Sequence, residues 1–242
     1  MEAVVDHFIC HLVAAMDQDC LKPLGMATGR TMEPFYAALV ERLGQWPAPR
    51  LDQLRRRWIS FNLDEYVGLG PDDPRSFAAY MHQLLGRHLG LSPLQLQLPS
   101  GTAENPADEA RRYAAALRHA GGIGLQLLGL GGNGHVGFNE PPSSPGSGCR
   151  VVTLQSSTRE QNSQVFGGDP NAVPVQAITL GLEEILAADE IHLIVTGGAK
   201  AEILRTALMA PCSDEVPASW LQRHPNMHLW VDDAACARLP VS

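Results

Sequence analysis

The chain has 242 residues, of which 45% are hydrophobic and 18% are charged, and its formal net charge is −8. This composition is typical of a globular protein that buries a full core, and it excludes a disordered chain. The acidic excess argues against nucleic acid or an anionic membrane as a partner, so an anionic ligand would need a local basic site.

Strands and helices are predicted to alternate along the chain. Apolar residues at helical spacing, or in short continuous runs, identify the elements. The predicted helices cover residues 2–16, 33–44, about 76–88 and 106–119, with a further one after residue 200. The predicted strands cover residues 23–27, 58–62, 123–130, 176–180, 190–195 and 227–231.

This alternation predicts an α/β fold, specifically a Rossmann-like three-layer sandwich with a mostly parallel sheet. No linker, repeat or shift in composition marks a boundary, so residues 1–242 are expected to form a single domain. In such sheets ligands bind beyond the carboxyl ends of the strands. Polar or glycine-rich segments follow four of the strands and should converge there: 28–31, 62–66, 131–140 and 196–200.

Two of these loops have features of a phosphate site. Thr28-Gly29-Arg30-Thr31 offers backbone N–H groups, hydroxyls and a guanidinium before a helix, although a turn with a threonine N-cap explains it equally well. Thr196-Gly197-Gly198-Ala199-Lys200 places Lys200 in the first turn of a helix, where the helix dipole disfavours a cation. Because the chain has only two lysines, we expect Lys200 to bind phosphate rather than simply face solvent.

The segment from Gly129 to Pro141 is the strongest candidate for a reactive site. It follows a buried strand and is rich in glycine, which allows the backbone to approach a ligand closely. Its polar residues include Asn133, His135 and Glu140, and a histidine oriented by a nearby carboxylate suits acid–base chemistry near neutral pH.

Other acidic and histidine residues give weaker signals. Asp64 follows a strand and could be a general base, although a helix cap or a solvent-facing turn explains an acid there more simply. His7 and His11 have the spacing of a metal-binding pair on a helix, but no third ligand is visible nearby, and His228 shows no ligand set. We therefore expect no metal, and no other cofactor.

The thiols and the amino-terminal residues predict a cytoplasmic protein. The five cysteines have no paired spacing, as expected of reduced thiols. The first residues are interrupted by charged and histidine side chains and lack a basic start, so they do not form a secretion signal.

Several motifs, in order, resemble the glucosamine-6-phosphate deaminase family. LGLGGNGHVGFNEP (128–141) is similar to its G-x-G-x-D-G-H-x-x-F-N-E-P signature, and NLDEYVGL (62–69) to its N-x-D-E-Y-V-G-L segment. ATGRT (27–31) and TGGAK (196–200) resemble its two phosphate loops. The resemblance covers nearly the whole chain and implies isomerising deamination of an amino-hexose-6-phosphate, a hydrolase-class reaction of amino-sugar catabolism that yields a ketohexose-6-phosphate and ammonia.

The family resemblance also implies residue roles. Asp64 matches the base that moves a proton between C2 and C1 of the opened sugar. His135 matches the residue that assists ring opening by protonating the ring oxygen, and Glu140 matches its carboxylate partner. Gly29, Thr31 and Lys200 match phosphate contacts.

The sequence departs from the family pattern at several positions. Asn133 replaces an aspartate beside His135, so it can fix the imidazole by a hydrogen bond but cannot stabilise the imidazolium by charge. Arg30 and Met32 replace Gly and Pro of the phosphate loop, and Gln164 replaces a phosphate-binding arginine for which Arg30 can substitute. Together with ITLGLEEIL (178–186) and VPASWLQRHPN (216–226), Asn133 resembles the galactosamine-6-phosphate branch.

Two alternatives remain at the level of sequence. A 6-phosphogluconolactonase shares this type of fold and a similar histidine loop, but Phe138-Asn139-Glu140-Pro141 fits the deaminases and not the lactonases. A non-catalytic sugar-phosphate sensor is consistent with the Asn133 and Gln164 departures, yet not with the retention of Asp64, His135 and Glu140. A small sugar phosphate is the expected partner, and a homo-oligomer is compatible with the family.

Overall fold

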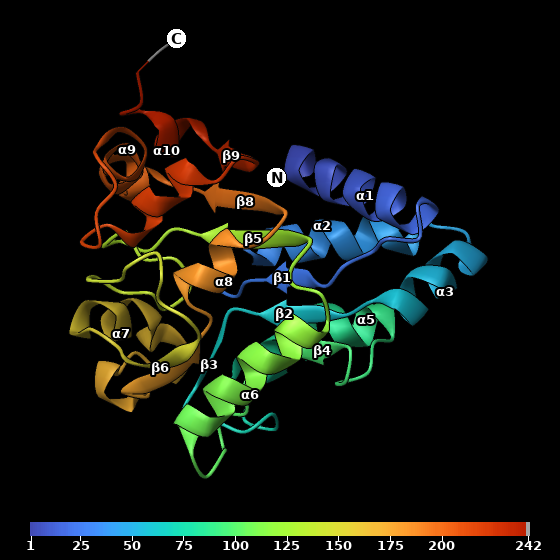
Figure 1. Cartoon of the computed structure of the whole chain (residues 1–242), viewed down its shortest axis with the longest axis horizontal. Helices are drawn as coiled ribbons and strands as arrows, with labels where there is room; N and C mark the ends of the chain where they lie inside the picture. Colours follow the sequence, from blue (N-terminus) through green and yellow to red (C-terminus); the bar gives the residue numbers. More distant parts are fainter. Residues whose placement is uncertain (241–242) are drawn as a thin grey trace.

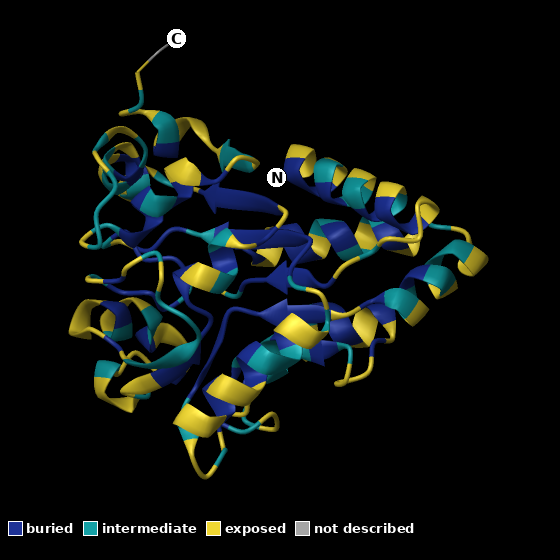
Figure 2. Ribbon diagram, in the orientation of Figure 1, coloured by how far each residue is buried: buried dark blue, intermediate teal, exposed yellow. Residues whose placement is uncertain are grey.

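A computed structural model describes residues 1–240 of the chain, and its centre is a parallel six-stranded sheet with the strand order β4-β2-β1-β5-β8-β9 (Figure 1). The bounds of these strands are β1 Leu24–Met26, β2 Ser60–Asn62, β4 Leu96–Gln97, β5 Leu125–Gly129, β8 Glu190–Val195 and β9 Met227–Val231. Every residue of β1, β2 and β8 is buried, and Figure 2 shows the sheet as the buried centre of the molecule. Both faces of these strands are therefore covered, as is typical of parallel sheets.

The helices pack on this sheet through apolar faces at helical spacing. In α1, Val4, Val5, Phe8 and Leu12 enter the main core, which extends from Val4 to Ala235. In Figure 1, α6 and α8 lie in front of the sheet. The α-helices are α1 Glu2–Asp17, α2 Glu33–Gly44, α3 Ala48–Arg57, α4 Phe77–Met81, α5 Arg87–Leu89, α6 Pro106–His119, α7 Ser156–Asn162, α8 Leu182–Leu186, α9 Ala201–Met209 and α10 Asp233–Cys236.

A second, antiparallel sheet lies beside the main one and has the order β3-β7-β6. Its strands are β3 Asp64–Tyr66, β6 Arg150–Thr153 and β7 Gln176–Thr179. Leu63 connects the two sheets, because its N–H donates to the Met26 carbonyl at 3.1 Å and its own carbonyl accepts from Leu180 N–H at 2.7 Å. The small sheet is thereby held against the carboxyl end of β1 and β2.

The predicted α/β class and parallel sheet are confirmed, with two corrections in detail. Residues 176–180 form the predicted strand, but it belongs to the antiparallel sheet rather than the parallel one. The predicted helix at 76–88 consists of α4, a π-helical segment His82–Gly86 and α5. Among residues 1–240, no helix is both long and apolar enough to cross a membrane.

Candidate active site

The four loops singled out in the sequence follow four neighbouring strands, β2, β1, β5 and β8. Because these strands are parallel, the loops meet at one edge of the sheet. A Cβ added to Gly132, in the loop after β5, would lie 3.8 Å from Nζ of Lys200, in the loop after β8. A Cβ added to Gly137 would lie 3.3 Å from Oδ2 of Asp64, which follows β2. The predicted polar loops therefore form one site.

Asp64 is the buried acid of this site. It is the first residue of β3, at the point where the chain leaves the main sheet, and it is 6% exposed. The loop carrying His135 packs closely on its carboxylate, because Gly137 has a φ of +55°, lacks a side chain and leaves room for Oδ2. The pKa of Asp64 is raised to about 8, chiefly by burial and also by the neighbouring charge of Glu65, while the Phe138 N–H opposes both.

Glu65 has a structural role, although it is adjacent to Asp64. Its carboxylate accepts hydrogen bonds from the backbone N–H groups of Tyr66, Phe77 and Ala78 at 2.9, 3.0 and 2.9 Å. Two of these groups belong to the start of α4, so Glu65 ties that helix to β3. Burial raises its pKa to about 7 while the three N–H groups lower it. Of the two adjacent acids, only Asp64 has no such set of backbone partners.

His135 belongs to a chain of hydrogen bonds that ends on Glu140. Nδ1 of His135 lies 2.7 Å from Oδ1 of Asn133, and the Asn133 amide donates to Glu140 Oε2 at 3.3 Å and to Gln155 Oε1 at 3.1 Å. The Gln155 N–H in turn donates to Glu140 Oε1 at 3.1 Å. Glu140 therefore acts on His135 through Asn133, and Gln155, which no sequence motif indicated, holds both.

These contacts fix the imidazole in one neutral form. Since Asn133 Oδ1 only accepts, Nδ1 of His135 carries the proton and Nε2 is left with a free lone pair. Burial lowers the pKa of His135 to about 4, and the positive charge of Lys200 lowers it as well. The ring lies directly on Gly131, where an added Cβ would overlap it. His135 is thus a neutral hydrogen-bond acceptor near pH 7.

Two basic side chains at the same edge have no acidic partner within the described residues 1–240. Arg30 and Lys200 take part in no ion pair there, and the pKa of Lys200 is lowered by burial and by the charge of Arg30. Two like charges held together in this way favour an anion between them. Tyr80 supports the first loop, since its hydroxyl donates to the Gly29 carbonyl at 3.0 Å.

The adjoining helix ends also favour an anion. The N-cap of α2 is Met32 and that of α9 is Lys200, and neither helix has a side-chain cap. The alternative of a threonine-capped turn at Thr28–Thr31 is therefore wrong, and the first N–H groups of α2 remain available to a ligand. Lys200 closes the 3₁₀ turn Gly198–Lys200 immediately before α9, one position outside the predicted helical turn.

Asn139, which sequence analysis left without a role, holds the loop in place. It is fully buried, its amide donates to the carbonyls of Val136 and Leu180 at 3.0 and 2.8 Å, and its oxygen accepts from Arg150 at 2.8 Å. The only signal in the sequence was its place beside Glu140. Asn139 therefore positions the loop rather than taking part in chemistry.

A cavity of about 290 Å³ adjoins Glu140, and the residues that line it include Pro142, Arg150 and Thr153. Asp64, His135 and Lys200 do not line it. We therefore do not assign the reacting sugar to this cavity.

The sequence and the fold are both similar to those of known proteins. The sequence model of the glucosamine-6-phosphate isomerases/6-phosphogluconolactonase family matches residues 1–230. A glucosamine-6-phosphate deaminase of Rhodopirellula baltica is 44% identical over 216 residues, which cover 89% of this chain and 84% of that protein. The structure of a monomeric glucosamine-6-phosphate deaminase superposes with a TM-score of 0.80 at 36% identity, covering 90% of this chain and 88% of the other.

The likeness to the solved lactonase structures shows the fold alone. A 6-phosphogluconolactonase from Trypanosoma cruzi superposes with a TM-score of 0.76 and covers 99% of this chain and 92% of its own, at 17% identity.

Proposed function

Because the chain belongs to the family of glucosamine-6-phosphate isomerases and 6-phosphogluconolactonases, we propose that it catalyses the isomerising deamination of an amino-hexose-6-phosphate. The observation that carries this proposal is the convergence of Asp64, the neutral His135 and the Arg30–Lys200 pair at one sheet edge. The substrate and one water give a ketohexose-6-phosphate and ammonia. Since water is consumed as the C–N bond breaks, the reaction is formally a hydrolysis coupled to an isomerisation.

The phosphate group binds at the start of α2 and α9. The N–H groups that follow Gly29 and the Thr28 and Thr31 hydroxyls donate hydrogen bonds, and Arg30 and Lys200 supply charge. Arg30 compensates for the absent arginine at Gln164. Binding the phosphate here places C1 and C2 of the sugar toward Asp64 and His135.

Ring opening is assigned to His135. Its free Nε2 accepts the proton of the C1 hydroxyl while the bond from C1 to the ring oxygen breaks, and the same proton is then delivered to the ring oxygen. The prediction that His135 protonates the ring oxygen is thereby extended by an earlier step, in which the neutral imidazole acts as a base. Asn133 and Glu140 hold the imidazole of His135 in the tautomer that this step needs.

Isomerisation is assigned to Asp64. Its carboxylate removes the proton from C2 of the opened sugar while the aldehyde oxygen at C1 takes up a proton from the C2 ammonium group, and the carboxylate then returns its proton to C1. The double bond thereby moves from C1–O to C2–N, and C1 becomes a CH2OH group. Water then adds at C2 and ammonia leaves. Because burial raises the pKa of Asp64 to about 8, the carboxylate is a stronger base than an exposed aspartate, which suits it to abstract a proton from carbon.

The test is ammonia release from glucosamine-6-phosphate and, separately, from galactosamine-6-phosphate by protein without added metal. The two relatives described above are named for glucosamine-6-phosphate, so we expect that sugar to give the higher kcat/KM; the predicted closeness to the galactosamine branch stays a prediction. No ammonia from either sugar would refute the proposal. Hydrolysis of 6-phosphogluconolactone would then indicate the lactonase alternative, and binding without turnover the sensor.

We propose further that the protein is cytoplasmic and that residues 1–242 act as one domain. The main core draws residues from the first to the last described helix, and all five cysteines are free thiols. A homo-oligomer stays a prediction, and light scattering of the purified protein tests it against the monomer named for the 36% identical relative.

A further inference from the structure

A second polar cluster lies at the opposite, amino-terminal end of the sheet strands. Glu190 and His192 are the first and third residues of β8, so they project from the same face, and His192 pairs in register with His228 of β9. His7, on the inner side of α1, reaches the same point. The prediction that His7 and His228 lack further ligands is therefore wrong, because the fold supplies partners distant in the sequence.

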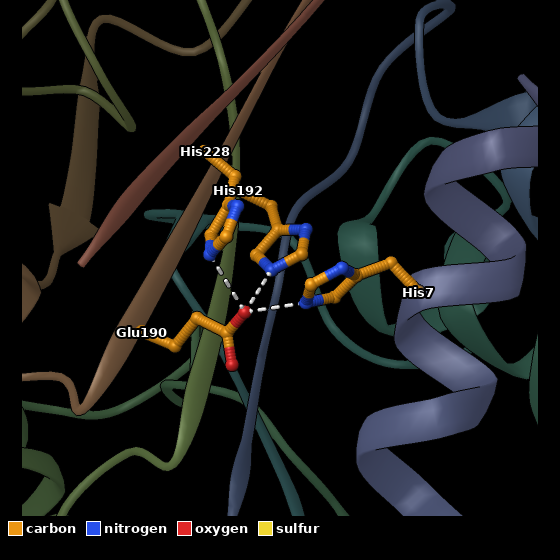
Figure 3. Close-up of side chains that lie close together, drawn as sticks. All are labelled: His7, Glu190, His192 and His228. Carbon is orange, nitrogen blue, oxygen red and sulfur yellow. Dashed lines mark hydrogen bonds and ion pairs between the residues drawn. The ribbon is translucent and has the colours of Figure 1, made fainter.

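Three imidazole nitrogens converge on one carboxylate oxygen. Oε1 of Glu190 lies 2.7 Å from Nε2 of His7, 2.8 Å from Nε2 of His192 and 3.1 Å from Nε2 of His228 (Figure 3). The four ligand atoms all lie within 4.8 Å of one another. Tetrahedral Zn²⁺ with bonds of about 2.1 Å separates its ligand atoms by about 3.4 Å, so small side-chain rotations suffice to surround an ion.

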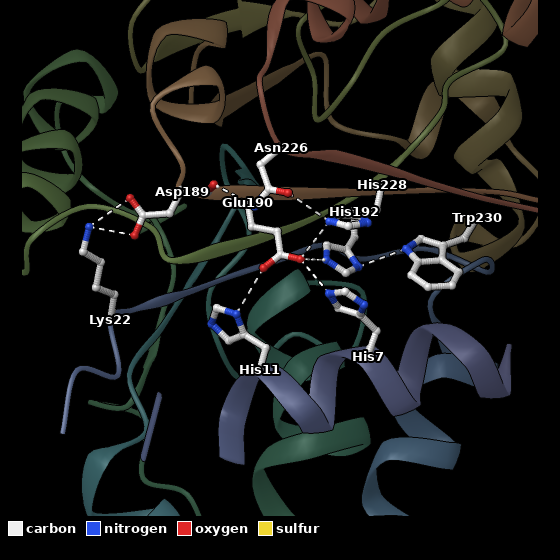
Figure 4. Close-up of polar contacts among 9 residues, drawn as sticks. All are labelled: His7, His11, Lys22, Asp189, Glu190, His192, Asn226, His228 and Trp230. Carbon is white, nitrogen blue, oxygen red and sulfur yellow. Dashed lines mark hydrogen bonds and ion pairs between the residues drawn. The ribbon is translucent and has the colours of Figure 1, made fainter. Parts of the chain in front are cut away.

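Hydrogen bonds divide the three histidines into two kinds. The Trp230 indole N–H donates to Nδ1 of His192 at 3.0 Å (Figure 4), which leaves the proton of His192 on Nε2 and makes that nitrogen a donor to Glu190. Within the described residues, Nδ1 of His7 and Nδ1 of His228 have no hydrogen-bond partner. Without a metal, Nε2 of each ring faces oxygen acceptors, Glu190 for both and also Asn226 Oδ1 at 3.0 Å for His228. Because their Nδ1 atoms are free, the two rings can move their proton to Nδ1 and present Nε2 to an ion.

We propose that His7, His228 and Glu190 bind one divalent transition-metal ion such as Zn²⁺, with His192 orienting the carboxylate. Two imidazoles and a carboxylate are a ligand set that Zn²⁺ takes, and solvent completes the coordination. The His7 and His228 side chains are 37% and 36% exposed, so an ion can enter, whereas His192 is fully buried. A buried residue that holds a ligand by a hydrogen bond is the usual support of a metal site.

Glu190 is available as a ligand because the nearby lysine pairs with a different acid and, among the described residues, only histidines form hydrogen bonds or ion pairs with the Glu190 carboxylate. Asp189 is paired with Lys22 at 2.8 Å (Figure 4), so that carboxylate is already neutralised. His11 lies 3.2 Å from the second oxygen of Glu190 and fixes the rotation of the carboxylate. A metal ion at this point would link α1 to β8 and β9, where the hydrogen bonds of His7 and His11 to Glu190 already join them.

Equilibrium dialysis of untagged, chelator-stripped protein against low micromolar Zn²⁺ tests the proposal. We expect one Zn²⁺ per chain and a higher Tm in its presence, since an ion that binds only the folded state stabilises it. His7→Ala, His228→Ala and Glu190→Gln should each weaken binding by more than the roughly 10–100-fold typical of outer-shell changes. His88→Ala, at an exposed histidine far from the cluster, and Cys10→Ser, a nearby thiol on α1, should bind as the wild type does.

Three results would overturn the proposal: no stoichiometric uptake by the wild type, uptake that survives all three ligand substitutions, or uptake that Cys10→Ser abolishes. Because Glu190 is buried and its variant can lose structure, a melting curve of each metal-free protein is recorded as a control for folding. If Glu190→Gln proves to be unfolded, the variants at the half-exposed His7 and His228 carry the test. The absorption spectrum of the Co²⁺-loaded protein gives a second readout. We expect visible bands typical of a Co²⁺ ion with few ligands, and no charge-transfer band from a thiolate ligand.

Discussion

Replacing Asp64 with asparagine removes the proposed base with almost no change of shape, and it should have opposite effects on activity and stability. Without a carboxylate no proton leaves C2, and we expect kcat to fall by roughly 10²–10⁴-fold, the range for loss of a general base. The same substitution removes a group that is costly to ionise where it lies. The variant should therefore be more stable than the wild type at neutral and alkaline pH.

The size of the stability effect follows from the pKa of Asp64. Its ordinary value of 3.8 is raised to about 8 in the folded protein, so between these values the folded state binds the proton and the unfolded state does not. Stability from this group is complete below pH 3.8 and is lost as the pH rises toward 8, by up to about 1.4 kcal/mol per pH unit. Between pH 5 and pH 8 the advantage of the variant should grow on the order of 4 kcal/mol.

Urea unfolding of both proteins at several pH values between 5 and 8 measures this difference, alongside ammonia assays on the same samples. Glu65 is present in both proteins, and its own titration with a pKa of about 7 largely cancels in the comparison. Parallel stability curves for the two proteins would refute the reasoning, because they would show an aspartate with no elevated pKa. An active variant would refute the assignment of Asp64 as the base.

Three further predictions concern the rest of the site. Lys200→Ala should raise KM by about 10–100-fold with little change in kcat, as loss of one charge-assisted phosphate contact does, and steady-state kinetics will show otherwise if kcat falls instead. Asn133→Asp should raise the pKa of His135 from about 4, because a carboxylate then faces Nδ1, and an NMR titration of the ring that does not move contradicts this. Asn139→Ala should lower the free energy of unfolding by about 2–4 kcal/mol, since it removes three buried hydrogen bonds, to the carbonyls of Val136 and Leu180 and from Arg150; an unchanged urea midpoint would exclude that role.

The parts of the fold that the sequence predicted are those with strong apolar patterns. The helices at 2–17, 33–44 and 106–119 bury regular stripes, and β5 and β8 are mostly apolar, so the apolar patterns located all of them. Helix α3 was missed because Leu54 is its only buried residue and most of its other residues are polar or charged. The three-residue strand β3 was missed because it starts with two charged residues, Asp64 and Glu65, which read as a loop.

The two polar sites differ in how far the sequence could predict them. The active-site residues lie in loops directly after strands, so the rule that parallel strands end at one edge was enough to bring them together. The histidine cluster depends on the register of β8 against β9 and on where α1 packs, and neither is visible in a linear chain. His192 lies within a mostly apolar strand and gave no signal in the sequence.

The Asn133 departure is explained by the state in which His135 must start. A base for the C1 hydroxyl has to be neutral, and both burial and Lys200 already hold the pKa of His135 at about 4. A partner that orients Nδ1 without bringing a negative charge against the ring keeps it neutral, and the Asn133 oxygen does so at 2.7 Å. Asn133 lies between the negative charge of Glu140 and the imidazole, and Glu140 acts only by accepting a hydrogen bond from the Asn133 amide. The Asn133 amide therefore fixes the tautomer of His135, while the charge of Lys200 helps to keep the pKa of the imidazole low. Because its pKa is low, the imidazole readily releases the proton that it accepted from the C1 hydroxyl to the ring oxygen of the sugar.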